Sequence, residues 1–311
     1  MRQRSLPQLN TSVSELALGT WGLTGEAYGP IQSSDADAII DRALQLGINL
    51  FETSDSYEHG GTLARLASRL PNSARVAVRI GFDRSHSPTK NFSPEYLRTA
   101  IARALDLLKR TSIDIALLHN PSPNVVSRTE APGILDELRA NHTIGAWGVS
   151  AGSPNVTTAA IESGSQVLSV AYNLFHTHEL HAVAAQVALR GIPVLAHSVL
   201  AYGLLAAHWG PNRTFAIDDH RRFRWNPTTL RARFSQLSLV RNLVGGDVLT
   251  PRAAALRFVL SNSLVTSAVI GPRSITQLDQ LVREVGNGPP YLPSNVMQGI
   301  SSKLRDAGIC P

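Results

Sequence analysis

Cysteine and lysine are scarce in this sequence. The only cysteine of the 311 residues is Cys310, so a single chain can form neither a disulfide framework nor a thiolate metal cluster. A chain without disulfides suits a reducing compartment, and we expect a cytoplasmic protein. Lysine occurs only at Lys90, Lys109 and Lys303, which leaves 26 arginines among the 29 basic residues.

Long apolar segments and runs of basic residues are also absent. No stretch approaches the roughly 20 apolar residues that a membrane span needs, so we predict no membrane association. The net charge of +6 would attract anions, but the basic residues are dispersed. We therefore interpret most of them as a solvated surface and expect no nucleic-acid partner. The hydrophobic fraction of 43% suffices for a large core.

Short apolar runs alternate with segments of helical period along the whole chain. Predicted strands cover residues 16–21, 48–51, 76–80, 113–118, 146–150, 167–172, 193–196 and 265–270. Helices are predicted over residues 33–47, 63–70, 93–109, 133–140, 156–162 and 179–190, from residue 250 onward, and over 276–285 and 295–306. Cap residues support several of these boundaries, such as Ser33 to Asp35 at a helix start and Gly47 at its end.

Eight strands that are each followed by a helix favour parallel pairing, because parallel strands need crossover connections. Eight such units close most naturally into a (β/α)8 TIM barrel. A doubly wound open sheet is the competing interpretation, but it usually has fewer strands and a glycine-rich first turn, which is missing here. We predict one barrel domain over residues 1–311, with a long loop after the seventh strand and an extra C-terminal helix.

The stretch FETSDSYE at residues 51–58 places two carboxylates and a phenol directly after an apolar run. Catalytic groups of TIM barrels lie where strands end, at the C-terminal rim. Polar residues follow several other predicted strands, including His119 and His197. A rim that combines Tyr, His, Arg and Glu is suited to acid–base chemistry.

These segments resemble the aldo-keto reductase family over nearly the whole chain. The similar motifs are Leu-Gly-Thr-Trp at 18–21, the 51–57 stretch followed by two glycines, Leu-Leu-His at 117–119, Gly-Val-Ser at 148–150, Ala-Tyr-Asn at 171–173 and Val-Ile-Gly-Pro-Arg-Ser-Ile-Thr-Gln-Leu at 269–278. The resemblance implies a barrel enzyme that reduces a small carbonyl compound with NADPH, or oxidises the matching alcohol.

The family's catalytic tetrad of Asp, Tyr, Lys and His is only half retained. The resemblance makes Tyr57 the general acid and His119 the residue that orients the substrate, while Glu52 and Arg79 stand where the family has Asp and Lys. Arginine is a planar fork that never loses its proton, unlike the compact ammonium of lysine. Lys90 lies eleven positions beyond Arg79 in a predicted loop, so no nearby lysine is an obvious substitute.

The resemblance also implies a set of cofactor-binding positions. Ser150 and Ser169 correspond to contacts with the nicotinamide amide, His197 to the residue that stacks under the ring, and Arg273, Ser274 and Gln277 to the binding site of a 2′-phosphate. The full set is Thr20, Trp21, Ser150, Ser169, His197, Ser198, Leu200, Gly203, Gly271, Arg273, Ser274 and Gln277.

Two other functions stay open because of the altered tetrad. One is a non-redox barrel enzyme that catalyses elimination, isomerisation or cyclisation, and the other is a catalytically silent nucleotide-binding homologue. We interpret Asp55 as supporting structure and predict that Arg222, Phe223 and Trp225 belong to a lid. The spacing of His176, His178 and His181 does not favour a metal site, and neither the substrate nor the oligomeric state follows from the sequence.

Overall fold

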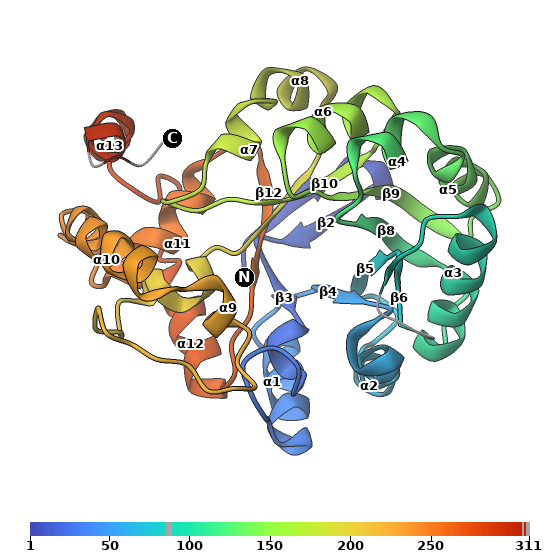
Figure 1. Ribbon diagram of the computed structural model, residues 1–311, viewed down its shortest axis with the longest axis horizontal. Coiled ribbons are helices and arrows are strands. Elements are labelled where there is room, and N and C mark those ends of the chain that lie inside the picture. The colour runs from blue at the N-terminus through green and yellow to red at the C-terminus, as the bar shows by residue number, and fades with distance from the viewer. Residues whose placement is uncertain (85–88, 307, 309–311) are drawn as a thin grey trace.

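A closed ring of eight parallel strands forms the centre of the molecule (Figure 1). The computed structural model describes residues 1–84, 89–306 and 308, so Cys310 lies outside the described residues. The barrel strands, in chain order, are β3 (Leu16–Gly19), β4 (Leu50–Ser54), β5 (Arg75–Ile80), β8 (Ile113–His119), β9 (Ile144–Ser150), β10 (Val167–Ala171), β11 (Val194–His197) and β12 (Val265–Ile270). The predicted fold class is confirmed.

Helices connect the strands and surround the ring in Figure 1. They are α1 (Ser33–Gln45), α2 (Gly61–Arg69), α3 (Pro94–Leu108), α4 (Pro123–Arg128), α5 (Ala131–Ala140), α6 (Pro154–Glu162), α7 (His178–His181), α8 (Ala184–Arg190), α11 (Pro251–Ser261), α12 (Ile275–Glu284) and α13 (Ser294–Asp306). The helix predicted over residues 179–190 is in fact two helices, which meet at Ala182 and Val183. Among the described residues, no helix combines the length and apolar character needed to cross a bilayer.

The second barrel strand extends further than its apolar run indicated. We predicted a strand over residues 48–51, whereas β4 begins at Leu50 and continues through Ser54. Because successive side chains of a strand alternate between faces, Leu50, Glu52 and Ser54 point into the barrel while Phe51 packs against the helices. Glu52 and Ser54 are therefore held by the strand ladder and not by a loop.

A hairpin that the sequence did not reveal precedes the barrel. It consists of β1 (Gln3–Leu6), the short 3-10 helix η1 (Pro7–Leu9) and β2 (Thr11–Ser14), which pair antiparallel. Leu6 and Val13 are fully buried and join the inner core of the barrel beside Ala17 and Leu50. The hairpin thus closes the N-terminal end of the barrel, opposite the rim at which the strands end.

The predicted long connection after the seventh strand contains secondary structure of its own. It includes the 3-10 helix η4 (Ala201–Ala206), α9 (Arg221–Arg224) and α10 (Pro227–Arg241), and α10 packs against α11 and η4 (Figure 1). A smaller two-stranded ribbon, β6 (Phe82–Asp83) with β7 (Thr89–Lys90), follows β5. Both insertions leave the C-terminal ends of barrel strands, so they surround the rim.

Candidate functional site

Glu52 and Arg79 form an ion pair inside the barrel. The Arg79 Nε contacts Glu52 Oε1, and the two side chains are only 14% and 4% exposed. Burial opposes a charge on Arg79, but the neighbouring Glu52, together with Tyr57 and Tyr202, raises the Arg79 pKa overall. The two substituted positions of the predicted tetrad thus compensate each other in charge, because an acid and a base are both retained.

Tyr57 lies in a turn of unusual backbone conformation just beyond β4. Glu58 and His59 have φ angles of 49° and 54°, and Gly60 follows at 94°. A side chain at Gly60 would place its Cβ 2.6 Å from Leu107 Cδ1, so only glycine fits this turn. Non-glycine residues in the left-handed region cost about 1–3 kcal/mol each and cluster at functional sites.

Similar backbone strain follows two other predicted site residues. The non-glycine residues with positive φ at the rim are Glu58, His59, Asn120, Ser198, Ala201 and Tyr202. Asn120 comes directly after His119, and Ser198 directly after His197. Three of the predicted site residues therefore precede turns that the surrounding structure holds in strained conformations.

His119 ends β8 and is a neutral imidazole. Burial, followed by the charges of Arg79 and Lys90, lowers its pKa to about 3. Its Nδ1 lies 3.4 Å from the hydroxyl of Ser54, so the other ring nitrogen, Nε2, is on the far side of the ring from that contact.

Lys90 is nearer to the site than its place in the sequence indicated. We expected Lys90 in a loop and no nearby lysine as an obvious substitute for the tetrad lysine. Lys90 in fact belongs to β7, which brings its Nζ into contact with the backbone carbonyl of Asn120. The charge of Lys90 acts on His119 but is not among the influences on Tyr57. Lys90 therefore does not take over the role of the missing tetrad lysine.

Arg79 links the groups of the rim electrostatically. Its charge lowers the pKa of Tyr57, although burial outweighs this effect and the Tyr57 pKa is raised overall. The same guanidinium, after burial itself, lowers the pKa of His197. The four predicted catalytic residues, Glu52, Tyr57, Arg79 and His119, therefore belong to one cluster at the C-terminal rim.

Two predicted cofactor contacts present buried hydroxyl groups without partners. Thr20 Oγ1 and Ser169 Oγ have no hydrogen-bond partner among the described residues, and both residues are fully buried. Unpaired buried hydroxyls are costly, so they suit a site that a polar ligand completes. Ser150 is also buried, and His197 Nδ1 lies 3.0 Å from Ser198 Oγ. These residues fit the amide end of a nicotinamide.

The predicted phosphate-binding segment already uses its donors within the protein. The Arg273 guanidinium donates to the carbonyls of Gly22, Tyr28, Gly29 and Pro30 at 2.7–3.1 Å. In the same segment the Ser274 hydroxyl caps α12, while the Gln277 side chain accepts the Arg273 N–H at 2.8 Å. In this conformation Arg273 holds the loop between β3 and α1, and at most one of its five N–H groups is left for an anion.

The long connection after β11 crosses the rim to the loop after β3. Tyr28 forms a β-bridge with Asp219, and His220 N–H donates to the Ala27 carbonyl at 2.9 Å. The His220 ring lies 4.3 Å from Trp21, 4.8 Å from Tyr28 and 5.5 Å from Tyr202 between ring centroids. Burial, opposed by Asp219, lowers the His220 pKa to about 4.

This crossing differs in detail from the predicted lid. Phe223 is 82% exposed and Arg222 stacks on it, so neither covers the rim. The inward positions belong to His220 and to Arg221, which pairs with Asp219 through several hydrogen bonds. The sequence singled out the correct stretch, but Arg222 and Phe223 of α9 point outward, whereas Trp225, directly after α9, is partly buried and packs against the core.

The remaining predicted cofactor residues follow the same strand ends. Leu200 and Gly203 belong to the turn around η4, and Gly203 adopts a φ of 96° against Trp209. Gly271 is exposed at the end of β12. Tyr28, Tyr202, His220 and Ser54 were missed, and their only signal was proximity in sequence to residues already singled out.

Comparison with known proteins identifies the fold family. The family model described as "Aldo/keto reductase family" matches residues 15–288. The chain belongs to the aldo/keto reductase family. The L-galactose dehydrogenase of Arabidopsis thaliana is 25% identical over 299 residues, which cover 91% of this chain and 87% of the relative. The D-threo-aldose 1-dehydrogenase of a Pseudomonas species is 26% identical over 318 residues, covering 92% of each chain.

Solved structures of aldo/keto reductases share the fold. The glycerol dehydrogenase of Gluconobacter oxydans superposes with a TM-score of 0.81 at 24% identity, covering 99% of this chain and 97% of the other. An aldo-keto reductase of Bacillus halodurans in its holo form gives 0.80 at 21% identity, with 97% and 96% covered. At these identities the likeness establishes the barrel. Family membership places the chain among oxidoreductases that act on small molecules.

Proposed function

We propose that this aldo/keto reductase reduces a carbonyl compound with NADPH, or oxidises the matching alcohol, with Tyr57 as the general acid. One observation carries the proposal: a buried ion pair of Arg79 with Glu52 stands at the C-terminal rim, where the charge of Arg79 lowers the pKa values of Tyr57, His119 and His197 against or alongside burial. The cluster combines a proton donor, a neutral imidazole and a fixed positive charge.

Tyr57, Arg79 and His119 have distinct roles in the proposed reaction. Thr20, Ser150 and Ser169 would hold the amide end of a nicotinamide, which would supply or accept the hydride. Tyr57 delivers its proton to the substrate oxygen, and Arg79 reduces the cost of the phenolate that this transfer leaves. His119 is neutral, so a nitrogen of its ring can form a hydrogen bond with the substrate oxygen. The low pKa of the ring prevents it from taking up the proton that Tyr57 transfers.

The cofactor assignment rests on the buried hydroxyls of Thr20 and Ser169 for the amide end. Arg273 and Ser274 are the candidates for the 2′-phosphate, which requires Arg273 to exchange backbone carbonyls of residues 22–30 for the phosphate. The relatives named for L-galactose and D-threo-aldoses favour a polyhydroxylated aldehyde or lactol as the substrate class. The scarcity of cysteine favours the cytoplasm as the site of action.

The decisive experiment removes the Tyr57 hydroxyl. We expect Tyr57→Phe to lower kcat for NADPH-dependent reduction of an aldose panel by about 100-fold or more, the usual contribution of a general acid. The matched control is Tyr291→Phe, which removes the hydroxyl of a buried tyrosine that bonds Glu15. A Tyr57→Phe enzyme that retains most of its kcat would overturn the assignment.

One feature favours the alternative of a barrel without hydride transfer. The guanidinium of Arg273 donates to backbone carbonyls, so it is not free to bind the phosphate of NADPH in this conformation. A fluorescence titration with NADPH and with NADH, measured apart from turnover, distinguishes it. Binding of NADPH without reduction of any aldehyde indicates a silent homologue, and turnover without nicotinamide indicates a non-redox enzyme.

A further inference from the structure

The Ser54 hydroxyl lies between His119 and Asp55. Ser54 is fully buried, and its Oγ is 3.4 Å from His119 Nδ1, 3.2 Å from Asp55 Oδ1, 3.0 Å from the Arg79 carbonyl and 2.9 Å from Ser56 Oγ. It also accepts the Ser56 N–H at 3.3 Å. A hydroxyl has one proton to donate, so these neighbours compete for it.

Asp55 and His119 are the main competitors for the proton of the Ser54 hydroxyl. The Arg79 carbonyl already accepts the Asp55 N–H at 3.1 Å, so it is satisfied without Ser54. The Ser56 hydroxyl can serve as donor or acceptor and imposes no direction. A carboxylate is the stronger acceptor when ionised, and it becomes a donor when protonated.

The direction of the hydrogen bond between Ser54 and His119 determines which ring nitrogen of His119 carries the proton. A neutral imidazole carries one proton, on either Nδ1 or Nε2. If Ser54 donates to Nδ1, the proton is on Nε2, which can then donate to a carbonyl oxygen. If Ser54 accepts from Nδ1, Nε2 is bare and can only accept, as from an alcohol hydroxyl.

We propose that Ser54 and Asp55 form a hydrogen-bonded relay that sets the tautomer of His119, with the ionisation of Asp55 deciding which ring nitrogen carries the proton. With Asp55 ionised, Ser54 donates to the carboxylate and His119 Nδ1–H donates to Ser54. When Asp55 takes up a proton from solvent, it donates to Ser54, Ser54 donates to Nδ1, and the imidazole exchanges its Nδ1 proton for one on Nε2. Ser54 and Asp55 are positioning residues, because they act through His119.

The surroundings of Asp55 let it titrate near neutral pH. Burial raises its pKa to about 6, against the lowering effects of Ser54, the Ser56 N–H, Arg103 and Tyr96. Arg103 and Tyr96 face it from α3, Tyr57 lies within its field, and Asp83 of β6 acts together with Asp55 on Tyr96.

His119 keeps its charge state while Asp55 titrates. Among the described residues, the charged or titratable groups that act on it include Arg79 from β5, Lys90 from β7 and His197 from β11. Both Arg79 and Lys90 oppose a second proton on the ring. Between about pH 5 and 7 the imidazole therefore changes tautomer, not charge. Only the effect of the tautomer on a bound substrate rests on the proposed function; the change of tautomer itself does not.

The test reads the tautomer directly by 15N NMR of histidine-labelled protein. The His119 signals are assigned by their loss in His119→Gln. We expect the wild type to change from the Nε2–H form at pH 5 to the Nδ1–H form at pH 7.5, with a midpoint near pH 6. Asp55→Asn, whose amide donates at every pH, is expected to hold the Nε2–H form throughout.

Serine substitutions provide the matched pair. Ser54→Ala removes the link, so the pH-dependent change disappears, while Ser54→Thr retains the hydroxyl and restores it. Ser56→Ala leaves the contact between Ser54 and His119 in place and keeps the change. A His119 tautomer that is the same at pH 5 and 7.5 in the wild type, or unaffected by Asp55→Asn, overturns the relay. Because NMR needs no turnover, loss of the relay and absence of reductase activity are separate results.

Discussion

At the scale of single residues, the buried pair Glu52–Arg79 is the feature that most distinguishes this rim. Glu52 is one methylene longer than the aspartate of the family pattern, and Arg79 is bulkier than the lysine. Glu52 stands opposite Gly19 on β3, and the Arg79 guanidinium pairs with the Glu52 carboxylate inside the barrel. The pair therefore keeps the charge balance of the tetrad with a different geometry.

Breaking this pair is predicted to destabilise the protein strongly. Glu52→Gln leaves the Arg79 charge buried without a counter-ion, which typically costs about 3–5 kcal/mol. The control is Glu26→Gln, which removes the partner of Arg84 where the carboxylate is 33% exposed, and is expected to cost about 1 kcal/mol or less. Urea unfolding measures both, and equal losses would show that Arg79 is not an uncompensated buried charge.

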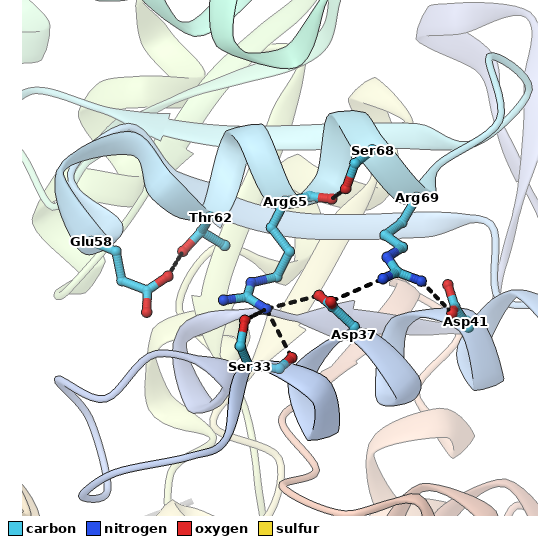
Figure 2. Close-up of polar contacts among 8 residues, drawn as sticks. All are labelled: Ser33, Asp37, Asp41, Glu58, Thr62, Arg65, Ser68 and Arg69. Carbon is cyan, nitrogen blue, oxygen red and sulfur yellow. Dashed lines mark hydrogen bonds and ion pairs between the residues drawn. The ribbon is translucent and has the colours of Figure 1, made fainter.

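At the scale of elements, α2 is fixed to α1 by a ladder of charged side chains (Figure 2). Arg65 and Arg69 of α2 both reach Asp37 of α1, at 2.8 and 2.9 Å, and Arg69 also reaches Asp41 at 2.7 Å. At the start of α2 the Thr62 hydroxyl donates to Glu58 at 3.1 Å. Because α2 begins directly after the turn that carries Tyr57, these contacts help to hold that turn in place.

The shared position of Asp37 makes it the sensitive member of the ladder. We expect Asp37→Asn to lower the free energy of unfolding by about 1 kcal/mol, because it weakens contacts with both arginines. Asp41→Asn, which affects only Arg69 at a more exposed position, should cost less. Thermal unfolding at low and high salt measures the two changes. The difference between the variants should shrink at high salt, and a difference that salt leaves intact would contradict an electrostatic origin.

At the scale of the whole molecule, the two ends of the barrel have separate roles. The N-terminal end is closed by the hairpin of β1 and β2, whose Leu6 and Val13 complete the inner core. The C-terminal end carries the strained turns, the buried polar groups and the insertion that reaches Tyr28 through Asp219. With the proposed function, the chemistry belongs to the end of the barrel opposite the hairpin.

This separation predicts a loss of stability without a loss of activity. Leu6→Ala removes a fully buried side chain and should cost about 2–5 kcal/mol of unfolding free energy. The same substitution at Leu189, which is 88% exposed, should be nearly neutral. Chemical unfolding measures the cost, and kcat below the unfolding range should match the wild type. A fall in kcat for folded Leu6→Ala would show that the two ends are coupled.

The sequence by itself determined the alternation of strands and helices, and with it the barrel and the rim. The resemblance of its motifs to the family also singled out Glu52, Tyr57, Arg79 and His119 as the candidate catalytic residues. Periodicity and capping are local properties of the chain, so they can be recognised without coordinates.

Only the tertiary structure decided how these groups are connected. It bound Arg273 to backbone carbonyls of residues 22–30, brought Lys90 next to His119 through Asn120, and turned His220 inward instead of Phe223. Each of these contacts joins residues that are far apart in the chain, across loops with left-handed turns. Their geometry depends on how the loops pack against one another, and no local pattern of residues encodes that packing.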